Sequence, residues 1–332
     1  MGSGGAAEGT GFTSEATASF AALLASTGSS VLVSTYQSRR LIVLRELDGV
    51  VNTHFLAFES PMGIATQGPD LALAAGRAVW RFRDRPALLD RLDPPGRHDA
   101  CFVPGSAHVT GDVRGHDLAF GDDGLWLVAT LFSCLATVDA GHSFVPRWRP
   151  PFVSALAADD RCHLNGLAMV DGRPGFVTCF GPTDEGGGWR AGGATRDGMV
   201  IDVASSETVA AGLCMPHSPR WHDGRLWLLE SGRGTLCVVD PSTGAVETVA
   251  KLPGFTRGLS FLGPWALVGL SLVRETVFDG APVKEGDRSC GVWAVDTRTG
   301  HVGGWLRFSG AVQELYDVQA LPGRRFATVL EP

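Results

Sequence analysis

Short apolar runs separated by polar turns make up most of the chain. Apolar and polar side chains alternate within the runs, and the breaks carry Asp-Gly, Thr-Gly or Pro-Gly. This pattern predicts many short strands joined by tight turns. Helical spacing occurs only from Ser14 to Leu24, where Phe20, Leu23 and Leu24 share one side and Ser14 is the candidate N-cap. We therefore expect an all-β fold with one short N-terminal helix.

The runs form a unit that recurs along the chain. Its clearest copy is SPRWHDGRLWLLESGRGTLCVVDPSTGAVETVAKL, residues 218–252, which contains four strand-like runs. First runs of the same kind begin at residues 63, 117, 166, 258 and 317. Four-stranded units of roughly 40–50 residues are typical of propeller blades, so six openings predict six blades.

One of the six units is divided between the two ends of the chain. The run from Asp317 is a first strand without successors, and the runs from Val31 look like later strands without a first. Pairing these halves closes the ring and leaves no sheet edge exposed. We expect residues 1–28 to form a tail and helix, and residues 29–332 to form a single six-bladed β-propeller. A β-sandwich or two small β domains is the alternative, but neither explains the matching halves.

Composition restricts the class of partner. The 332 residues include 28 Lys and Arg against 35 Asp and Glu, a dispersed net charge of −7, which argues against nucleic acid. No apolar run reaches the roughly 20 residues of a transmembrane helix, so no membrane partner is expected. The seven cysteines are odd in number and lack a C-x-x-C pair. We interpret them as buried, reduced thiols of a cytoplasmic protein.

The rim of the predicted channel is rich in polar side chains. The first strand of a blade lies against the channel, and the residues just before it surround one mouth. Three successive blades place a histidine there, and other polar residues join them from the remaining blades: His116, His163, His217, Arg114, Asn165, Arg257, Glu314 and Tyr316. Converging polar groups bind one another, water or a ligand.

Histidine is the ligand type that points to a transition metal, because Ca²⁺ and Mg²⁺ sites are built from oxygen atoms. The three histidines with Glu314 fill four positions and leave room for substrate. Asp117 or Asp317 is expected to hold an imidazole N–H. Fe or Cu is favoured, with Zn or Ni as alternatives, and no organic cofactor is expected. In the competing interpretation, the histidines are only hydrogen-bonded channel residues.

These residues lead to two hypotheses of different classes. The first is a metal-dependent enzyme acting on a small molecule or peptide, with oxidation favoured over hydrolysis or isomerisation. In it, Glu314 is a ligand or general base, Arg257 and Tyr316 are catalytic, and Asn165 and Arg114 contact substrate with Arg257. Arg257 alternatively neutralises Glu314. The second hypothesis is a non-catalytic propeller that binds a protein or ligand. Residues 83–115, read as a long loop, are a candidate lid.

The chain resembles an uncharacterised bacterial family of conserved hypothetical proteins. The resemblance runs from about Val31 to Leu321 through LVSTYQSRRL, NTHFLAF, HVTGDVRGHDLAFG, HSFVPRWRPPFVSALAADDRCHLNGLA, MPHSPRWHDGRLWLLESG, LPGFTRGL and QELYDVQ. It implies no established activity.

More distantly, the architecture is similar to six-bladed gluconolactonase- and strictosidine-synthase-type propellers. The gluconolactonases hold a divalent ion with Glu, Asn and Asp oxygens, where this chain has histidines, so the resemblance implies neither lactonase activity nor Ca²⁺. A histidine-lined axis is analogous to that of the seven-bladed carotenoid-cleaving oxygenases, which bind iron through four histidines.

Overall fold

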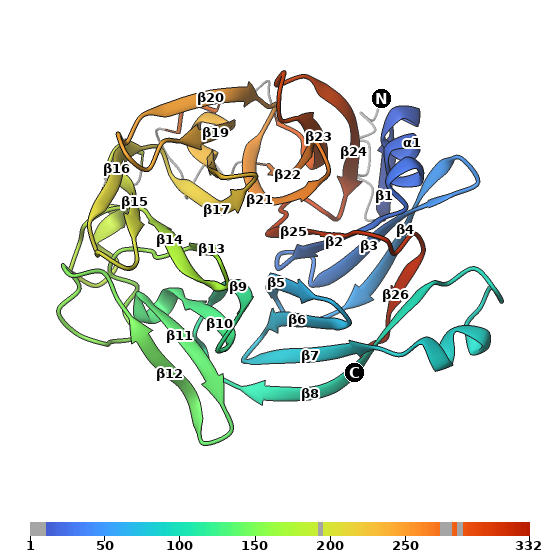
Figure 1. Ribbon diagram of the computed structural model, residues 1–332, viewed down its shortest axis with the longest axis horizontal. Helices are drawn as coiled ribbons and strands as arrows, with labels where there is room; N and C mark the ends of the chain where they lie inside the picture. Colours follow the sequence, from blue (N-terminus) through green and yellow to red (C-terminus); the bar gives the residue numbers. More distant parts are fainter. Residues whose placement is uncertain (1–10, 192–194, 273–280, 284–287) are drawn as a thin grey trace, which may run out of the picture.

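Six sheets surround a central axis, as the ribbon in Figure 1 shows. The structure, a computed structural model, describes residues 11–191, 195–272, 281–283 and 288–332. Each sheet is one blade and its first strand lies nearest the axis, which confirms the predicted six-bladed β-propeller. From the axis outward, blades 1 to 3 consist of β5 (Pro61–Gln67), β6 (Asp70–Ala75), β7 (Ala78–Asp84) and β8 (Ala100–Val109); β9 (Gly115–Gly121), β10 (Gly124–Ala129), β11 (Cys134–Asp139) and β12 (His142–Trp148); and β13 (Gly166–Val170), β14 (Arg173–Cys179), β15 (Gly198–Asp202) and β16 (Thr208–Leu213).

Blades 4 and 5 follow the same order, and blade 6 takes its strands from both ends of the chain. They consist of β17 (Pro216–His222), β18 (Arg225–Glu230), β19 (Thr235–Val239) and β20 (Val246–Lys251); β21 (Phe255–Leu262), β22 (Trp265–Ser271), β23 (Cys290–Asp296) and β24 (Val302–Gly310); and β25 (Asp317–Leu321), β2 (Ser30–Thr35), β3 (Arg40–Leu47) and β4 (Val50–Ala57).

Ring closure occurs in blade 6, as the divided repeat predicts. Strand β25 pairs antiparallel with β2, with Val318 opposite Val33. Two further strands extend neighbouring blades. Strand β1 (Phe12–Ala16) pairs with β24 at the outer edge of blade 5, and β26 (Ala327–Val329) runs parallel to β8 of blade 1. Both termini are thus tied to sheets other than the one that closes the ring.

Turn chemistry explains the tight connections between strands. At Asp48-Gly49, Asp171-Gly172 and Asp223-Gly224, both residues have positive φ. This is the type I′ geometry, which matches the twist of an antiparallel pair and favours Asp-Gly or Asn-Gly.

The N-terminal helix is present, but the predicted start is wrong. Helix α1 spans Ala18–Thr27 and is capped by Thr17, whose hydroxyl accepts a hydrogen bond from the Phe20 N–H. Ser14, the predicted cap, lies in β1 instead, because its backbone pairs with β24. The predicted apolar face of α1 is buried and packs against strands of blades 5 and 6.

The expected long loop at residues 83–115 is also corrected. It contains the 3-10 helix η1 (Pro86–Arg91) and β8, whose ten residues form the fourth strand of blade 1. The sequence pattern missed β8 because Pro104, Gly105 and Ser106 interrupt its apolar run. Only the end of this segment, at Asp112 and Arg114, lines the axial pocket described below.

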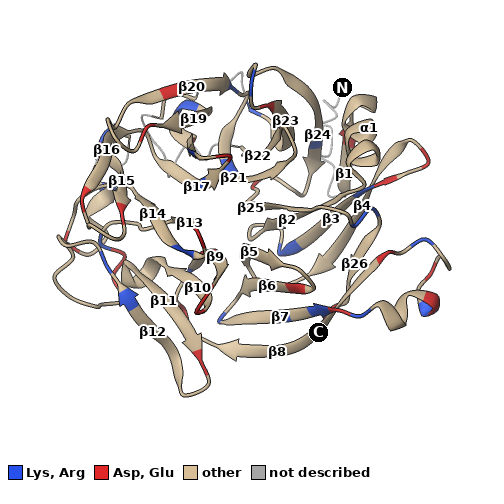
Figure 2. Ribbon diagram, in the orientation of Figure 1, with Lys and Arg blue, Asp and Glu red and all other residues tan. Residues whose placement is uncertain are grey.

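The remaining expectations concern cysteines and charge. All seven cysteines are buried free thiols. Figure 2 shows acidic and basic residues scattered around the ring. None of the helices in the described ranges has the length and apolar character needed to cross a membrane.

Candidate functional site

Alternate blades use small and polar residues where the inner strands meet. Gly63, Gly166 and Gly258 belong to blades 1, 3 and 5, and a Cβ on any of them would lie 2.2–2.8 Å from an atom of the next inner strand. Glycine therefore permits the close approach of neighbouring strands.

The matching residues of blades 2, 4 and 6 tie the inner strands together. Asp117 accepts a hydrogen bond from the Leu167 N–H, Ser218 from the Gly258 N–H and Asp317 from the Ile64 N–H. Each of these bonds crosses to the following blade.

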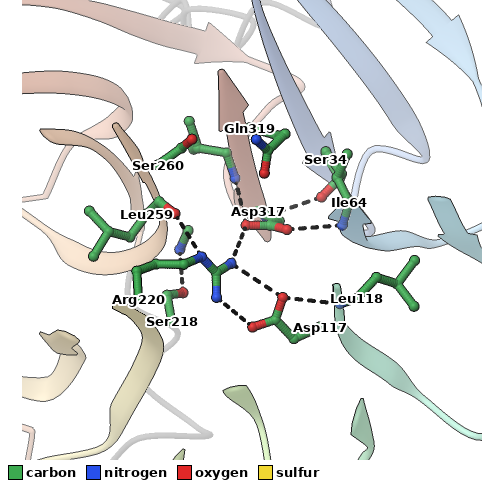
Figure 3. A network of polar contacts seen from close by, with 12 residues as sticks. Ser34, Ile64, Asp117, Leu118, Ser218, Arg220, Leu259, Ser260, Asp317 and Gln319 are labelled. Carbon is green, nitrogen blue, oxygen red and sulfur yellow. Dashed lines mark hydrogen bonds and ion pairs between the residues drawn. The ribbon is translucent and has the colours of Figure 1, made fainter. Parts of the chain in front are cut away.

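A buried ionic cluster, which we call the hub, occupies the axis. Figure 3 shows the Arg220 guanidinium between Asp117 and Asp317. Arg220 is 2.7 Å from Asp117 and 3.6 Å from Asp317, and both carboxylates keep only 4% of their side-chain exposure. The expectation that Asp117 or Asp317 holds an imidazole N–H is therefore wrong, because they bind Arg220 and backbone N–H groups instead.

Replacing Asp317 with asparagine tests the charge state of the hub. Burial raises the pKa of Asp317 to about 7, against the opposing attraction of Arg220. Between roughly pH 4 and pH 7 the folded protein therefore holds a proton that the unfolded chain releases, and the contribution of Asp317 to stability falls as pH rises, by at most about 1.4 kcal/mol per pH unit.

We expect the Asp317→Asn variant to be less destabilised, relative to the wild type, at pH 8 than at pH 5. Urea unfolding of both proteins at the two pH values measures this difference. An equal loss of stability at both values would contradict the protonated state.

Two cavities lie on the axis, one on each side of the hub. Residues that precede the hub in the sequence of each inner strand line the first, and residues that follow it line the second. The first, the axial pocket, has a volume of about 440 Å³. The second, of about 200 Å³, includes Leu118, Leu167 and Arg220 itself. The axial pocket is lined by Tyr36, Glu59, Ser60, Met62, Gly76, Arg77, Asp112, Arg114, His116, His163, Phe180, Trp189, Arg190, His217, Arg257 and Tyr316.

All three predicted histidines line the axial pocket. His116 lies in β9 and His217 in β17, whereas His163 lies in the loop before β13. His163 nevertheless reaches the pocket, and its ring centroid lies 5.0 Å from that of His116. His163 has φ +52°, a left-handed conformation that Ser60, Arg114 and Met215 share at the same place in blades 1, 2 and 4. This repeated turn replaces the extended strand that the sequence spacing assumes.

Each imidazole is oriented through its Nδ1 atom. Nδ1 of His116 is 2.9 Å from the Arg114 carbonyl oxygen, and Nδ1 of His163 is 3.1 Å from the Asp160 carboxylate. Nδ1 of His217 is 2.8 Å from the Ser231 hydroxyl and 3.1 Å from the carbonyl oxygen of Met215. The partners of His116 and His163 have no proton to give, so Nδ1 carries the hydrogen in these two residues and their Nε2 lone pairs are left free.

The electrostatic environment keeps the imidazoles neutral. Burial lowers the pKa of His116 and of His217 well below the usual value, and nearby positive charge lowers it further. Burial also lowers the pKa of His163, although the hydrogen bond that its ring donates to the Asp160 carboxylate opposes this. Nε2 of His217 is buried and has no hydrogen-bond partner among the described residues. The pocket therefore presents acceptor atoms rather than imidazolium cations.

Arg257 and Tyr316, the two residues predicted to be catalytic with Glu314, stack inside the pocket. The Arg257 guanidinium carbon lies 3.8 Å from the centroid of the Tyr316 ring, and this ring contacts His116 at 5.1 Å between centroids. Burial raises the pKa of Tyr316 far above its usual value, so its hydroxyl stays protonated.

The other three predicted residues have different surroundings. Glu314 accepts a hydrogen bond from the Tyr36 hydroxyl and does not itself line the pocket. Asn165 is buried behind the rim, where its side-chain oxygen accepts a hydrogen bond from Thr178. Arg114 lines the pocket and lies 3.5 Å from Asp160.

The sequence analysis missed a group of lining residues that follow second strands. Tyr36, Arg77 and Phe180 come directly or nearly directly after β2, β6 and β14. The first and second strands of a blade are antiparallel, so the end of the second strand lies beside the start of the first. Residues that follow a second strand are therefore expected at the same mouth as the residues that precede a first strand. Trp189 and Arg190, from the 3-10 helix η3 (Gly188–Arg190) in the Gly-rich loop, carry no comparable signal.

The imidazoles do not form a complete metal site as they stand. Within the described ranges, no group of three or more His, Cys, Asp or Glu side chains has an arrangement that could hold a metal ion.

The fold and the axial pocket define a six-bladed β-propeller with a small-molecule-sized site at one mouth. Residues 18–330 match the family described as a domain of unknown function (DUF4915), and the chain belongs to this family. No curated protein matches it significantly.

Two solved structures share the fold. A chain of a nidogen/laminin complex has a TM-score of 0.55 and 10% identity, covering 89% of this chain and 99% of that one. A protein of unknown function from Bacteroides caccae has a TM-score of 0.54 and 11% identity, covering 88% and 98%. At this identity the likeness concerns the fold alone.

Proposed function

We propose that the protein is an enzyme whose active site is the axial pocket, and that His116, His163 and His217 bind a divalent transition metal there through Nε2. The observation that carries the proposal is the shared Nδ1 arrangement. A metal-bound histidine typically donates its second ring N–H to a carbonyl or carboxylate, as Nδ1 of His116 and His163 does, and Nδ1 of His217 contacts both the Met215 carbonyl and the Ser231 hydroxyl.

The spacing of two imidazoles supports the same proposal. Two imidazoles on one tetrahedral ion, with metal–nitrogen distances of about 2.0–2.1 Å, have ring centroids roughly 5 Å apart. The centroids of His116 and His163 are 5.0 Å apart. Because no complete set of three ligands is preformed, we expect ion binding to rotate at least one side chain, and His217 has a free, buried Nε2 for this purpose.

Glu314 has a different part in this proposal from its predicted one. Its carboxylate accepts a hydrogen bond from the Tyr36 hydroxyl. The centroid of the Tyr36 ring lies 5.6 Å from that of the Tyr316 ring. Glu314 therefore acts as a positioning residue for the aromatic wall, while its roles as fourth ligand or general base stay predictions.

Elemental analysis of untagged protein tests the proposal. We expect about one transition-metal ion per chain, with Fe or Cu indicating oxidative chemistry and Zn or Ni indicating hydrolysis or isomerisation. The His217→Ala variant should bind the ion at least 10- to 100-fold more weakly, as loss of even an outer partner does. The matched control is His301→Ala, which removes an exposed imidazole before β24.

The competing class, a non-catalytic ligand-binding propeller, is favoured by the absence of a preformed ligand set among the described residues. Wild-type protein that stays metal-free after anaerobic reconstitution with Fe²⁺, and with Cu, Zn or Ni ions, would establish that class and contradict the metalloenzyme.

A further inference from the structure

The charge of the axial pocket differs in sign from that of the chain. Four arginines line it, Arg77, Arg114, Arg190 and Arg257, against the two carboxylates of Glu59 and Asp112. The whole chain has a net charge of −7. A cationic cavity in an acidic protein attracts anions.

Arg257 differs from the other three arginines, because Arg77 is exposed to solvent and Arg114 and Arg190 have an acidic partner. Arg114 and Arg190 lie 3.5 and 3.3 Å from the buried Asp160 carboxylate. Arg257 stacks on Tyr316, its Nε is buried without a hydrogen-bond partner, and it forms no ion pair with a residue in the described ranges. A buried guanidinium nitrogen without a partner is costly, and the planar fork of an arginine matches a carboxylate.

The imidazoles specify what lies beside that anion. The Nε2 atoms of His116 and His163 are acceptors, because Nδ1 carries the proton in these two residues. A phosphate or sulfate presents mainly acceptor oxygens and would meet these lone pairs unfavourably. A hydroxyl group, by contrast, donates to an imidazole lone pair.

The remaining walls are apolar or aromatic. Met62, Phe180 and Trp189 line the pocket, and Trp189 contacts both the Arg190 guanidinium and the His163 ring. The volume of about 440 Å³ lies within the range of small-molecule sites, roughly 300–1,000 Å³.

We infer that the ligand of the axial pocket is a small hydroxycarboxylic acid, with its carboxylate on Arg257 and its carbon skeleton against Met62 and Phe180. In the metal-free protein its hydroxyl donates to an imidazole Nε2 atom, the position that the metal takes in the loaded protein. This inference rests on the proposed function, since it assigns a substrate class to the same pocket. Its test uses metal-free protein, in which the Nε2 atoms are open to the hydroxyl.

Three related probes test the two contacts separately. Mandelate carries a carboxylate and a hydroxyl, phenylacetate lacks the hydroxyl, and mandelamide lacks the charge. Calorimetric titration of chelator-treated protein should show mandelate binding roughly tenfold to a hundredfold more tightly than mandelamide, as expected for a hydrogen bond to a charged group. Mandelate should also bind roughly two- to tenfold more tightly than phenylacetate, because one neutral hydrogen bond is lost.

Variants assign the preference to Arg257. Arg257→Gln should abolish the preference for mandelate over mandelamide, whereas Arg77→Gln, which removes the same charge from an exposed position on the same pocket, should retain most of it. If Arg257→Gln does not fold, the comparison of the three probes in the wild type decides alone.

Equal binding of mandelate and mandelamide to the wild type would overturn the inference, and so would retention of the preference in Arg257→Gln. Failure of the proposed function has a different signature, a protein that takes up no metal, and it leaves the probe affinities unchanged.

Discussion

Replacing Arg220 with methionine is expected to lower the free energy of unfolding by about 3–5 kcal/mol, the cost of breaking a buried ion pair and leaving its partner unpaired. Here two carboxylates lose their shared cation. Asp117 and Asp317 keep only 4% of their side-chain exposure, so water cannot replace the guanidinium. Chemical unfolding of the variant and the wild type at pH 8, above the pKa of about 7 of Asp317, measures the loss.

The matched control for this variant is Arg83→Met. Arg83 forms an exposed ion pair with Asp70 at 3.0 Å, with 52% and 41% of their side chains exposed. Exposed pairs contribute about 0–1 kcal/mol, so this substitution should change stability little. An equal decrease in the free energy of unfolding in both variants would show that the hub contributes no more to stability than an exposed ion pair does.

Deletion of residues 317–332 is expected to abolish folding of the isolated chain. The deletion removes β25 and β26, and with them the buried side chains of Val318, Leu321, Phe326 and Val329. Four large side chains at about 1.5–3 kcal/mol each amount to roughly 6–12 kcal/mol. This is comparable to the whole stability of a typical domain, about 5–15 kcal/mol.

The deletion also exposes backbone at the centre of the ring. Strand β2 loses its partner from Leu321 to Asp317 and becomes an open edge, which favours aggregation. Soluble expression and circular dichroism test the prediction. Deletion of residues 331–332 alone, which leaves both strands in place, is the control and should remain folded. A soluble, cooperatively unfolding 316-residue variant would show that strand closure is dispensable.

The sequence pattern predicted the ring because the relevant signals are local. Alternation and Asp-Gly turns act within a few residues, and the repeat showed where each blade begins. The aligned positions Gly63, Asp117, Gly166, Ser218, Gly258 and Asp317 all lie where inner strands meet. The predicted start of the helix was wrong because strand pairing, which the local pattern does not show, determines the conformation of Ser14. This residue pairs with β24 as part of β1 and does not cap α1.

The site was predicted only in part. The sequence identified His116, His163 and His217 as pocket residues, together with Arg114, Arg257 and Tyr316. It missed Arg220, which follows a Ser-Pro pair where the pairing of β17 with β18 shifts register. Such a shift turns a side chain away from the face that strict alternation gives it.

The sequence by itself determined the number of blades, the joining of the two ends and the residue types gathered at one mouth, because periodicity and turn chemistry are properties of neighbouring residues. Only the tertiary structure decided which groups pair. Asp117 and Asp317 form ion pairs with Arg220 and not hydrogen bonds with an imidazole. His163 is oriented by Asp160 instead. These choices join residues up to 103 positions apart. They depend on distances across the axis, which no local pattern encodes.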